Sequence, residues 1–127
     1  MKKKFIDPLI KRKANLTKNV QFYKKNIPLP SVIEISESGT CNRKCSFCPR
    51  SAPDFLDIKE FVSEDLIFKL SKELSSYDYS GIFLFSGFVE PMIDKNIYNL
   101  VSIVRSNLSK ARIEMVTNGD ALNKPRV

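Results

Sequence analysis

The sequence contains no histidine and no tryptophan among its 127 residues. Without histidine, the chain lacks the side chain that most often serves as a metal's nitrogen ligand or as a general base. Its three cysteines are an odd number, which does not suit the paired cysteines of a secreted disulfide scaffold. No apolar run approaches the roughly 20 residues of a membrane span, and no signal-like apolar stretch follows the N-terminus. We therefore expect a cytoplasmic protein without a membrane span.

Positive charge is concentrated at one end of the chain. Residues 1–30 hold nine of the 21 Lys and Arg residues and only one acidic residue, so the rest of the chain is close to neutral. We interpret residues 1–31 as a basic N-terminal arm that is helical from Asp7-Pro8 onward, because Pro is favoured at the first helical position. The arm either packs on the domain with its lysines in solvent or contacts nucleic acid, a membrane surface or an acidic partner. The apolar residues of the predicted helix lie roughly on one face: Leu9, Leu16, Val20 and Tyr23.

Apolar periodicity after the arm predicts strands that alternate with helices. Strands are expected at 32–36, 82–86 and 112–117; helices are expected near 63–77, with Ser63 as N-cap, and 94–108, with Asp94 as N-cap. Such alternation is typical of an α/β fold with a parallel sheet, and it places both helices on one face. A closed (β/α) barrel needs about 250 residues. Residues 32–127 are therefore interpreted as parallel βα units of a partial TIM-like barrel, truncated after about three strands and incomplete at the C-terminus.

All three cysteines lie in the connection that follows the first predicted strand. Cys41, Cys45 and Cys48 form a C-x-x-x-C-x-x-C pattern, which brings three thiolates toward one centre, and thiolates are the ligands of iron–sulfur clusters. Three ligands on a four-iron cluster leave one iron open. A structural zinc site takes four ligands, and the chain has neither a fourth cysteine nor a histidine. We expect the three sulfurs to converge near one point. The neighbouring cations either favour the thiolates or are plain surface charges: Arg43, Lys44 and Arg50.

Two other interpretations of the cysteines stay open. The chain could be a small metal-binding module, with zinc or an iron–sulfur cluster, whose basic arm binds RNA in a salt-dependent way. It could also be an electron-transfer protein with an ordinary four-ligand cluster, although that function requires a fourth cysteine.

The cysteine pattern, with the aromatic Phe47 before its last cysteine, resembles that of the radical SAM superfamily. The stretch Ser-Gly-Phe-Val-Glu-Pro at 86–91 is similar to the S-G-x-G-E-P stretch that many members carry after the second strand. Thr117-Asn118-Gly119 resembles the T-N-G that follows the third strand. Val89 stands where the family usually has Gly, and Gly accepts backbone angles that a β-branched residue resists. The stretch Cys48-Pro49-Arg50-Ser51 is similar to the corresponding stretch of family members that often carry a downstream auxiliary cluster domain of the SPASM type.

The resemblance implies a radical SAM enzyme with one 4Fe–4S cluster and S-adenosylmethionine as cofactors. Cys41, Cys45 and Cys48 would ligate the cluster, and its open iron would bind S-adenosylmethionine. An external electron donor would then drive reductive cleavage to a 5′-deoxyadenosyl radical, which abstracts hydrogen from an unknown substrate. Other cofactor contacts would come from Phe47 against the adenine, Gly87 and Glu90 beside the methionine amino group, and Asn118.

Each of the three motifs follows a predicted strand. Sites of α/β barrels form at the C-terminal ends of the strands, so the cysteines, Glu90 and Asn118 are expected at one edge of the sheet. Substrate contacts in such barrels come from many loops. We therefore expect this chain alone to be inactive on substrate.

Overall fold

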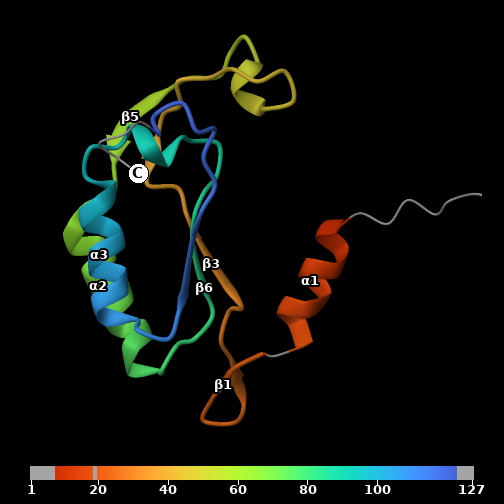
Figure 1. Cartoon of the computed structure of the whole chain (residues 1–127), viewed down its shortest axis with the longest axis vertical. Coiled ribbons are helices and arrows are strands. Elements are labelled where there is room, and N and C mark those ends of the chain that lie inside the picture. The colour runs from red at the N-terminus through yellow and green to blue at the C-terminus, as the bar shows by residue number, and fades with distance from the viewer. Residues whose placement is uncertain (1–7, 19, 123–127) are drawn as a thin grey trace, which may run out of the picture.

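The computed structural model describes residues 8–18 and 20–122. Its elements follow a strand–helix alternation with additional short strands (Figure 1). Asp7, predicted to precede the first helix, lies outside the described residues. The elements are, in order, α1 (Pro8–Lys18), β1 (Phe22–Tyr23), β2 (Ile27–Pro28), β3 (Val32–Ile35), β4 (Ser38–Gly39), η1 (Pro49–Ser51), β5 (Ile58–Phe61), α2 (Glu64–Ser76), β6 (Ile82–Phe85), η2 (Pro91–Ile93), α3 (Ile97–Asn107) and β7 (Arg112–Met115).

The three predicted strands form one parallel sheet in the order β3-β6-β7. Ile33 is in register with Phe83 and Ile113. Two positions along the strands, Ile35 is aligned with Phe85 and Met115. Successive side chains of a strand point to opposite faces, so these two apolar rows share one face, and they contact the main core. The predicted parallel arrangement is therefore confirmed.

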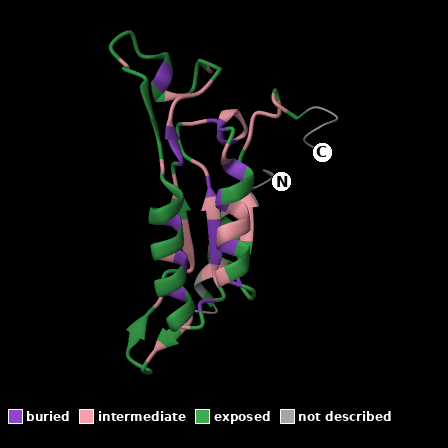
Figure 2. Cartoon of the chain, turned by 90° about the vertical axis from the view of Figure 1, so that its left-hand side faces the viewer, coloured by how far each residue is buried: buried purple, intermediate pink, exposed green. Residues whose placement is uncertain are grey.

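Helices α2 and α3 pack against each other and against the same face of the sheet (Figure 1). Buried residues gather between these helices and the sheet, whereas the outer helix surfaces are exposed (Figure 2). Ser63 caps α2 as predicted, since its side-chain oxygen accepts a hydrogen bond from the Leu66 amide at 3.2 Å. The shared core includes Ile67, Leu74, Phe83, Phe85, Leu100 and Val104.

The N-cap predicted for the second helix is wrong. Helix α3 begins at Ile97 with Asn96 as its N-cap. Asp94 instead ends the short 3₁₀ helix η2, and its carboxylate accepts a hydrogen bond from the Asn96 amide at 2.8 Å. The carboxylate therefore stabilises a separate turn before the helix begins. Asp side chains often form such local hydrogen bonds to the backbone in place of helical hydrogen bonds.

The N-terminal arm is helical only in its first part. Helix α1 ends at Lys18, and β1 pairs with β2 as an antiparallel hairpin. Lys24 and Lys25 both have positive φ in the connecting turn, which is the backbone conformation of tight hairpins. Tyr23, predicted on the helix, lies in β1, where its ring packs edge-on against Tyr77.

Gln21 attaches this arm to the turn after α2. Its side-chain amide donates to the carbonyls of Tyr77 and Asp78 at 3.2 and 2.8 Å, and its oxygen accepts from the Ser80 amide at 3.0 Å. Helix α1 lies on the side of the sheet opposite α2 and α3 (Figure 1), where Arg12 pairs with Glu114. The arm therefore contacts the domain through the polar side chains of Arg12 and Gln21 and also through the Tyr23 ring.

A second hairpin lies in the connection that the sequence left without secondary structure. Strands β4 and β5 pair antiparallel, with Ser38 opposite Phe61. They close the base of a loop that carries all three cysteines. Among residues 8–18 and 20–122, no helix has the length and apolar character needed to cross a bilayer.

Phe83 tests this core. Replacing it by Ala should lower the free energy of unfolding by about 3–5 kcal/mol, because the buried ring leaves a cavity between sheet and helices. Phe68→Ala is the control, since that ring on α2 is 53% exposed. Urea denaturation of both variants checks the difference; equal losses would contradict the packing described here.

Candidate functional site

The cysteine loop begins directly after β4 and turns tightly between its second and third cysteines. The Cys48 amide donates to the Cys45 carbonyl at 2.9 Å, and the Arg43 amide donates to Cys41 Sγ at 3.4 Å. All three cysteines are free thiols and partly exposed. The loop therefore presents three unoxidised sulfurs with one backbone donor already directed at Cys41.

The structure does not place the three sulfurs around a single metal ion, and their convergence on one cluster stays a prediction. Across residues 8–18 and 20–122, no three Cys, Asp or Glu side chains are placed to hold one metal ion. A single ion draws all its ligands to itself, whereas the thiolates of an iron–sulfur cluster bind different irons of a larger body. The loop geometry therefore gives no support to a zinc site.

Arg50 is the buried anchor of the cysteine loop rather than a surface charge. Its side chain is 2% exposed and donates to the carbonyls of Gly39 and Phe88 at 3.2 and 3.0 Å. It also pairs with Asp57, and its guanidinium lies 5.0 Å from the centre of the Phe55 ring. Arg50 thus joins the start of the loop, its end and the loop after β6.

The loop after β6 passes close to the end of β3. Gly87 has a φ of 124°, and a Cβ there would lie 2.2 Å from Ser36 Oγ. This position therefore favours glycine because of its backbone angle, and a larger residue would also have to displace the Ser36 hydroxyl. Val89 is not among the described residues with positive φ, so a β-branched residue fits where the family usually has Gly.

Glu90 joins the loops after all three strands of the parallel sheet. Its amide donates to the Thr40 carbonyl at 3.1 Å, immediately before the first cysteine. Its carboxylate is 1% exposed and accepts hydrogen bonds from the Thr117 hydroxyl at 2.5 Å and the Asn118 amide at 2.7 Å. A further bond comes from the Met92 amide at 3.0 Å. The carboxylate is therefore engaged within the protein.

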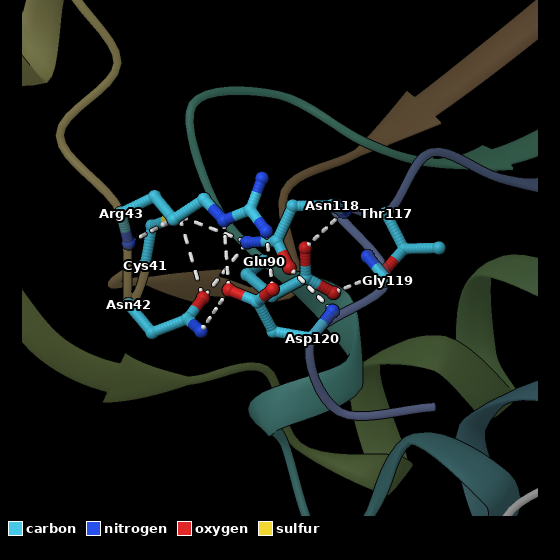
Figure 3. Close-up of polar contacts among 8 residues, drawn as sticks. All are labelled: Cys41, Asn42, Arg43, Glu90, Thr117, Asn118, Gly119 and Asp120. Carbon is cyan, nitrogen blue, oxygen red and sulfur yellow. Dashed lines mark hydrogen bonds and ion pairs between the residues drawn. The ribbon is translucent and has the colours of Figure 1, made fainter. Parts of the chain in front are cut away.

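Asn118 connects the T-N-G turn to the cysteine loop (Figure 3). Its side-chain amide donates to Asn42 Oδ1 at 2.8 Å and lies 3.9 Å from Cys41 Sγ. Gly119 has a φ of 80°, which lets the chain turn back after Asn118. The motifs after β3, β6 and β7 thus meet at one edge of the sheet, as predicted.

Asp120 closes the same network from the end of this turn. Its carboxylate accepts from Arg43 through both oxygens and from Asn42 Nδ2 at 3.0 Å (Figure 3). The hydrogen bond from Arg43 is the main reason that the pKa of Asp120 lies below its usual value. Arg43 in turn has a raised pKa because of this hydrogen bond.

Phe47 is the most exposed of the predicted site residues. Its ring is 89% exposed, so the chain itself leaves both ring faces accessible. An exposed aromatic ring next to the cysteines is available for stacking on a planar ligand.

A pair of buried carboxylates lies beneath the site. Glu37, the second residue after β3, is 0% exposed, and Asp94 is 5% exposed. One oxygen of each has no hydrogen-bond partner in the described part of the chain. Burial raises the pKa of Glu37, and the charges of Asp94 and Glu90 add to this effect.

Sequence reasoning missed two residues of this site. Arg50 was treated as one cation among three near the cysteines, because sequence carries no sign of which cation is buried. Asp120, which directly follows the T-N-G motif, was given no role, because its partner Arg43 lies 77 positions away in the chain. An acid next to the T-N-G motif and an arginine inside the cysteine motif were the available signals.

Arg50→Met tests the anchor. The variant should lower the free energy of unfolding by roughly 1–3 kcal/mol, because two carbonyls lose their buried donor. Lys44→Met is the matched control, since Lys44 is exposed in the same loop. Urea denaturation measures both; an Arg50 variant as stable as its control would show that Arg50 does not anchor the loop.

Glu37→Gln tests the buried carboxylate. Its raised pKa means that the folded chain binds this proton more tightly than the unfolded chain. The stabilisation from Glu37 is therefore present at low pH and is lost as pH rises through the folded pKa. The variant should exceed the native chain in stability at neutral pH and lose this advantage below the ordinary glutamate pKa of 4.5.

The control for this experiment is Glu60→Gln, which changes an exposed glutamate of β5. Stability curves against pH for the three proteins give the comparison. A Glu37→Gln variant that is less stable than the native chain at neutral pH would contradict the assignment.

Comparison with known proteins places this edge of the sheet in context. The family model described as the radical SAM superfamily matches residues 35–127. An S-adenosyl-L-methionine-dependent 2-deoxy-scyllo-inosamine dehydrogenase from Niallia circulans is 33% identical over 97 residues, which are 76% of this chain and 38% of that enzyme.

Two solved structures are similar to this chain in both fold and sequence. The crystal structure of BtrN in complex with AdoMet and 2-DOIA gives a TM-score of 0.71 at 33% identity, covering 77% of this chain and 39% of BtrN. BtrN in an open conformation gives 0.68 at 33% identity over 77% of this chain and 43% of that structure. The family match covers β6, β7, the last residue of β3 and the three loops joined by Glu90, and the chain belongs to the radical SAM superfamily.

Proposed function

We propose that this chain is the cluster-binding and cofactor-binding part of a radical SAM enzyme. The observation that carries the proposal is the meeting of three loops, after β3, β6 and β7, through the buried Glu90 and through Asn118. These loops carry the cysteine, S-G-F-V-E-P and T-N-G motifs respectively. The zinc or RNA-binding alternative is not favoured, because the family match points elsewhere.

In this proposal Cys41, Cys45 and Cys48 hold a 4Fe–4S cluster. The donor set fits: three free, partly exposed thiols lie in one loop, and the Arg43 amide already donates to one of them. Cysteine thiolates are the ligands of such clusters, and amide donors to the sulfurs stabilise them. When bound, the cluster supplies the electron that cleaves S-adenosylmethionine to a 5′-deoxyadenosyl radical.

The protein's own residues bind and orient the cofactor. Phe47 has an exposed ring, which we propose stacks on the adenine. We propose that the Gly87–Glu90 loop binds the methionine end. The Glu90 carboxylate holds that loop against Thr117 and Asn118, so we propose that it acts on the cofactor mainly by fixing the backbone around it. Asn118 adds a side-chain amide on the same side.

The substrate and partners are proposed from the relatives. The chain spans 38% of the length of the Niallia circulans dehydrogenase, and substrate contacts in barrels come from many loops. Oxidation of 2-deoxy-scyllo-inosamine, the reaction named for that relative, is therefore the first reaction to test in a protein with the full barrel. We propose that residues 32–127 form part of a TIM-like barrel and that this chain alone is inactive on substrate. We also propose that the enzyme is cytoplasmic and takes its electron from an external donor. The motif at Cys48-Pro49-Arg50 supports a SPASM-type domain.

Anaerobic reconstitution with iron and sulfide tests the proposed cluster. The native chain should bind iron and turn brown, and its spectrum should change when S-adenosylmethionine is added. Cys45→Ala should lose this colour, because each cysteine supplies one ligand and the sequence has no fourth. Ser46→Ala, a change at the next position, should retain it. Normal iron content and colour in Cys45→Ala would refute the ligand assignment.

A further inference from the structure

Arg43 lies among the cysteines with a fixed partner from the other end of the chain. Its guanidinium forms a fork with both oxygens of Asp120, and Nε lies 2.7 Å from Oδ2. The two residues are 77 positions apart. The Asp120 amide donates to Asn118 Oδ1 at 2.9 Å, so the acid is held in place by the T-N-G turn as well. Figure 3 shows the guanidinium, the carboxylate and Cys41 within one group.

Electrostatic influences of opposite sign therefore reach the Cys41 sulfur. The Asn118 amide and the Arg43 cation favour negative charge on it, and the Asp120 carboxylate opposes this. Asn118 Nδ2 lies 3.9 Å from Cys41 Sγ and can donate to it. Arg43 is close enough to Cys41 and Cys45 for their charges to act on its guanidinium, and Asp120 neutralises that positive charge. Hydrogen-bond donors and net charge around the sulfurs set the reduction potential of iron–sulfur clusters.

We propose that Asp120 is a positioning residue that sets the reduction potential of the cluster through Arg43, in opposition to the Asn118 amide. This inference rests on the proposed function, because it requires Cys41, Cys45 and Cys48 to ligate a cluster. Reduction adds negative charge to the cluster, so a nearby donor or cation favours the reduced form. Asp120 cancels the cation and holds the potential low, whereas Asn118 donates and raises it.

The role is separable from stability. The side chains of Arg43 and Asp120 are 47% and 39% exposed, and ion pairs this exposed contribute little to stability. Asp120→Asn keeps an oxygen that can accept from Arg43 while it removes the negative charge. The variant should therefore fold and bind iron like the native chain, with the Arg43 charge left uncompensated.

The two variants should shift the potential in opposite directions. Asp120→Asn should move the midpoint potential to a more positive value, because the cation is unmasked. Asn118→Ala should move it to a more negative value, because the donor to Cys41 is lost. A contact that merely supports the fold would not produce shifts of opposite sign.

The experiment is a redox titration of the reconstituted chain, followed by electron paramagnetic resonance without S-adenosylmethionine. Iron and sulfide are counted for each protein, and Asp54→Asn, an exposed acid in the same connection, controls for a general change of charge. Opposite shifts that exceed the Asp54→Asn shift support the inference. Shifts of one sign, shifts no larger than the control, or loss of the cluster in Asp120→Asn would overturn it.

The same titration separates this inference from the proposed function. A native chain that binds no cluster would overturn both. A native chain with a full cluster, whose potential does not respond to Asp120, would overturn only the role of Asp120.

Discussion

The buried carboxylate of Glu90 is the interaction on which the rest of the site depends. A carboxylate that is 1% exposed is costly to bury without partners, and this one has the Thr117 hydroxyl and the amides of Met92 and Asn118. Its own amide reaches the carbonyl of Thr40, next to the first cysteine. One residue therefore contacts all three loops and helps to fix the relative positions of the cysteines, the glycine-containing loop and the T-N-G turn.

The architecture below explains why these loops meet. Parallel strands all end at the same edge, so the connections that leave β3, β6 and β7 begin side by side. Helices α2 and α3 bury the apolar rows of one sheet face and hold the strands in register. Arg50 then folds the cysteine loop back onto the loop after β6. The core supplies a rigid edge, and buried polar side chains arrange the functional loops upon it.

Features with local causes could be predicted from the sequence, and features with distant partners could not. Apolar periodicity located β6 and the two core helices, and Ser63 marked the start of α2, because burial and capping act within a few residues. The hairpin of β1 and β2 was missed because a basic, weakly apolar stretch looked equally helical. Arg50 and Asp120 were missed because their roles depend on Phe88 and Arg43, which approach them only after folding. Val89 stands where the family usually has Gly. The backbone accepts it, because the residue of this loop with a positive φ is Gly87 and not Val89.

The central claim is that the cysteine loop holds a cluster with one iron open to S-adenosylmethionine. Mössbauer spectroscopy of the anaerobically reconstituted chain, with and without S-adenosylmethionine, tests it most directly because it reports on individual irons. The account predicts a cluster in which one iron differs from the others and changes its signal when S-adenosylmethionine is added. A cluster whose irons all ignore S-adenosylmethionine, or iron bound without a cluster signature, would contradict it.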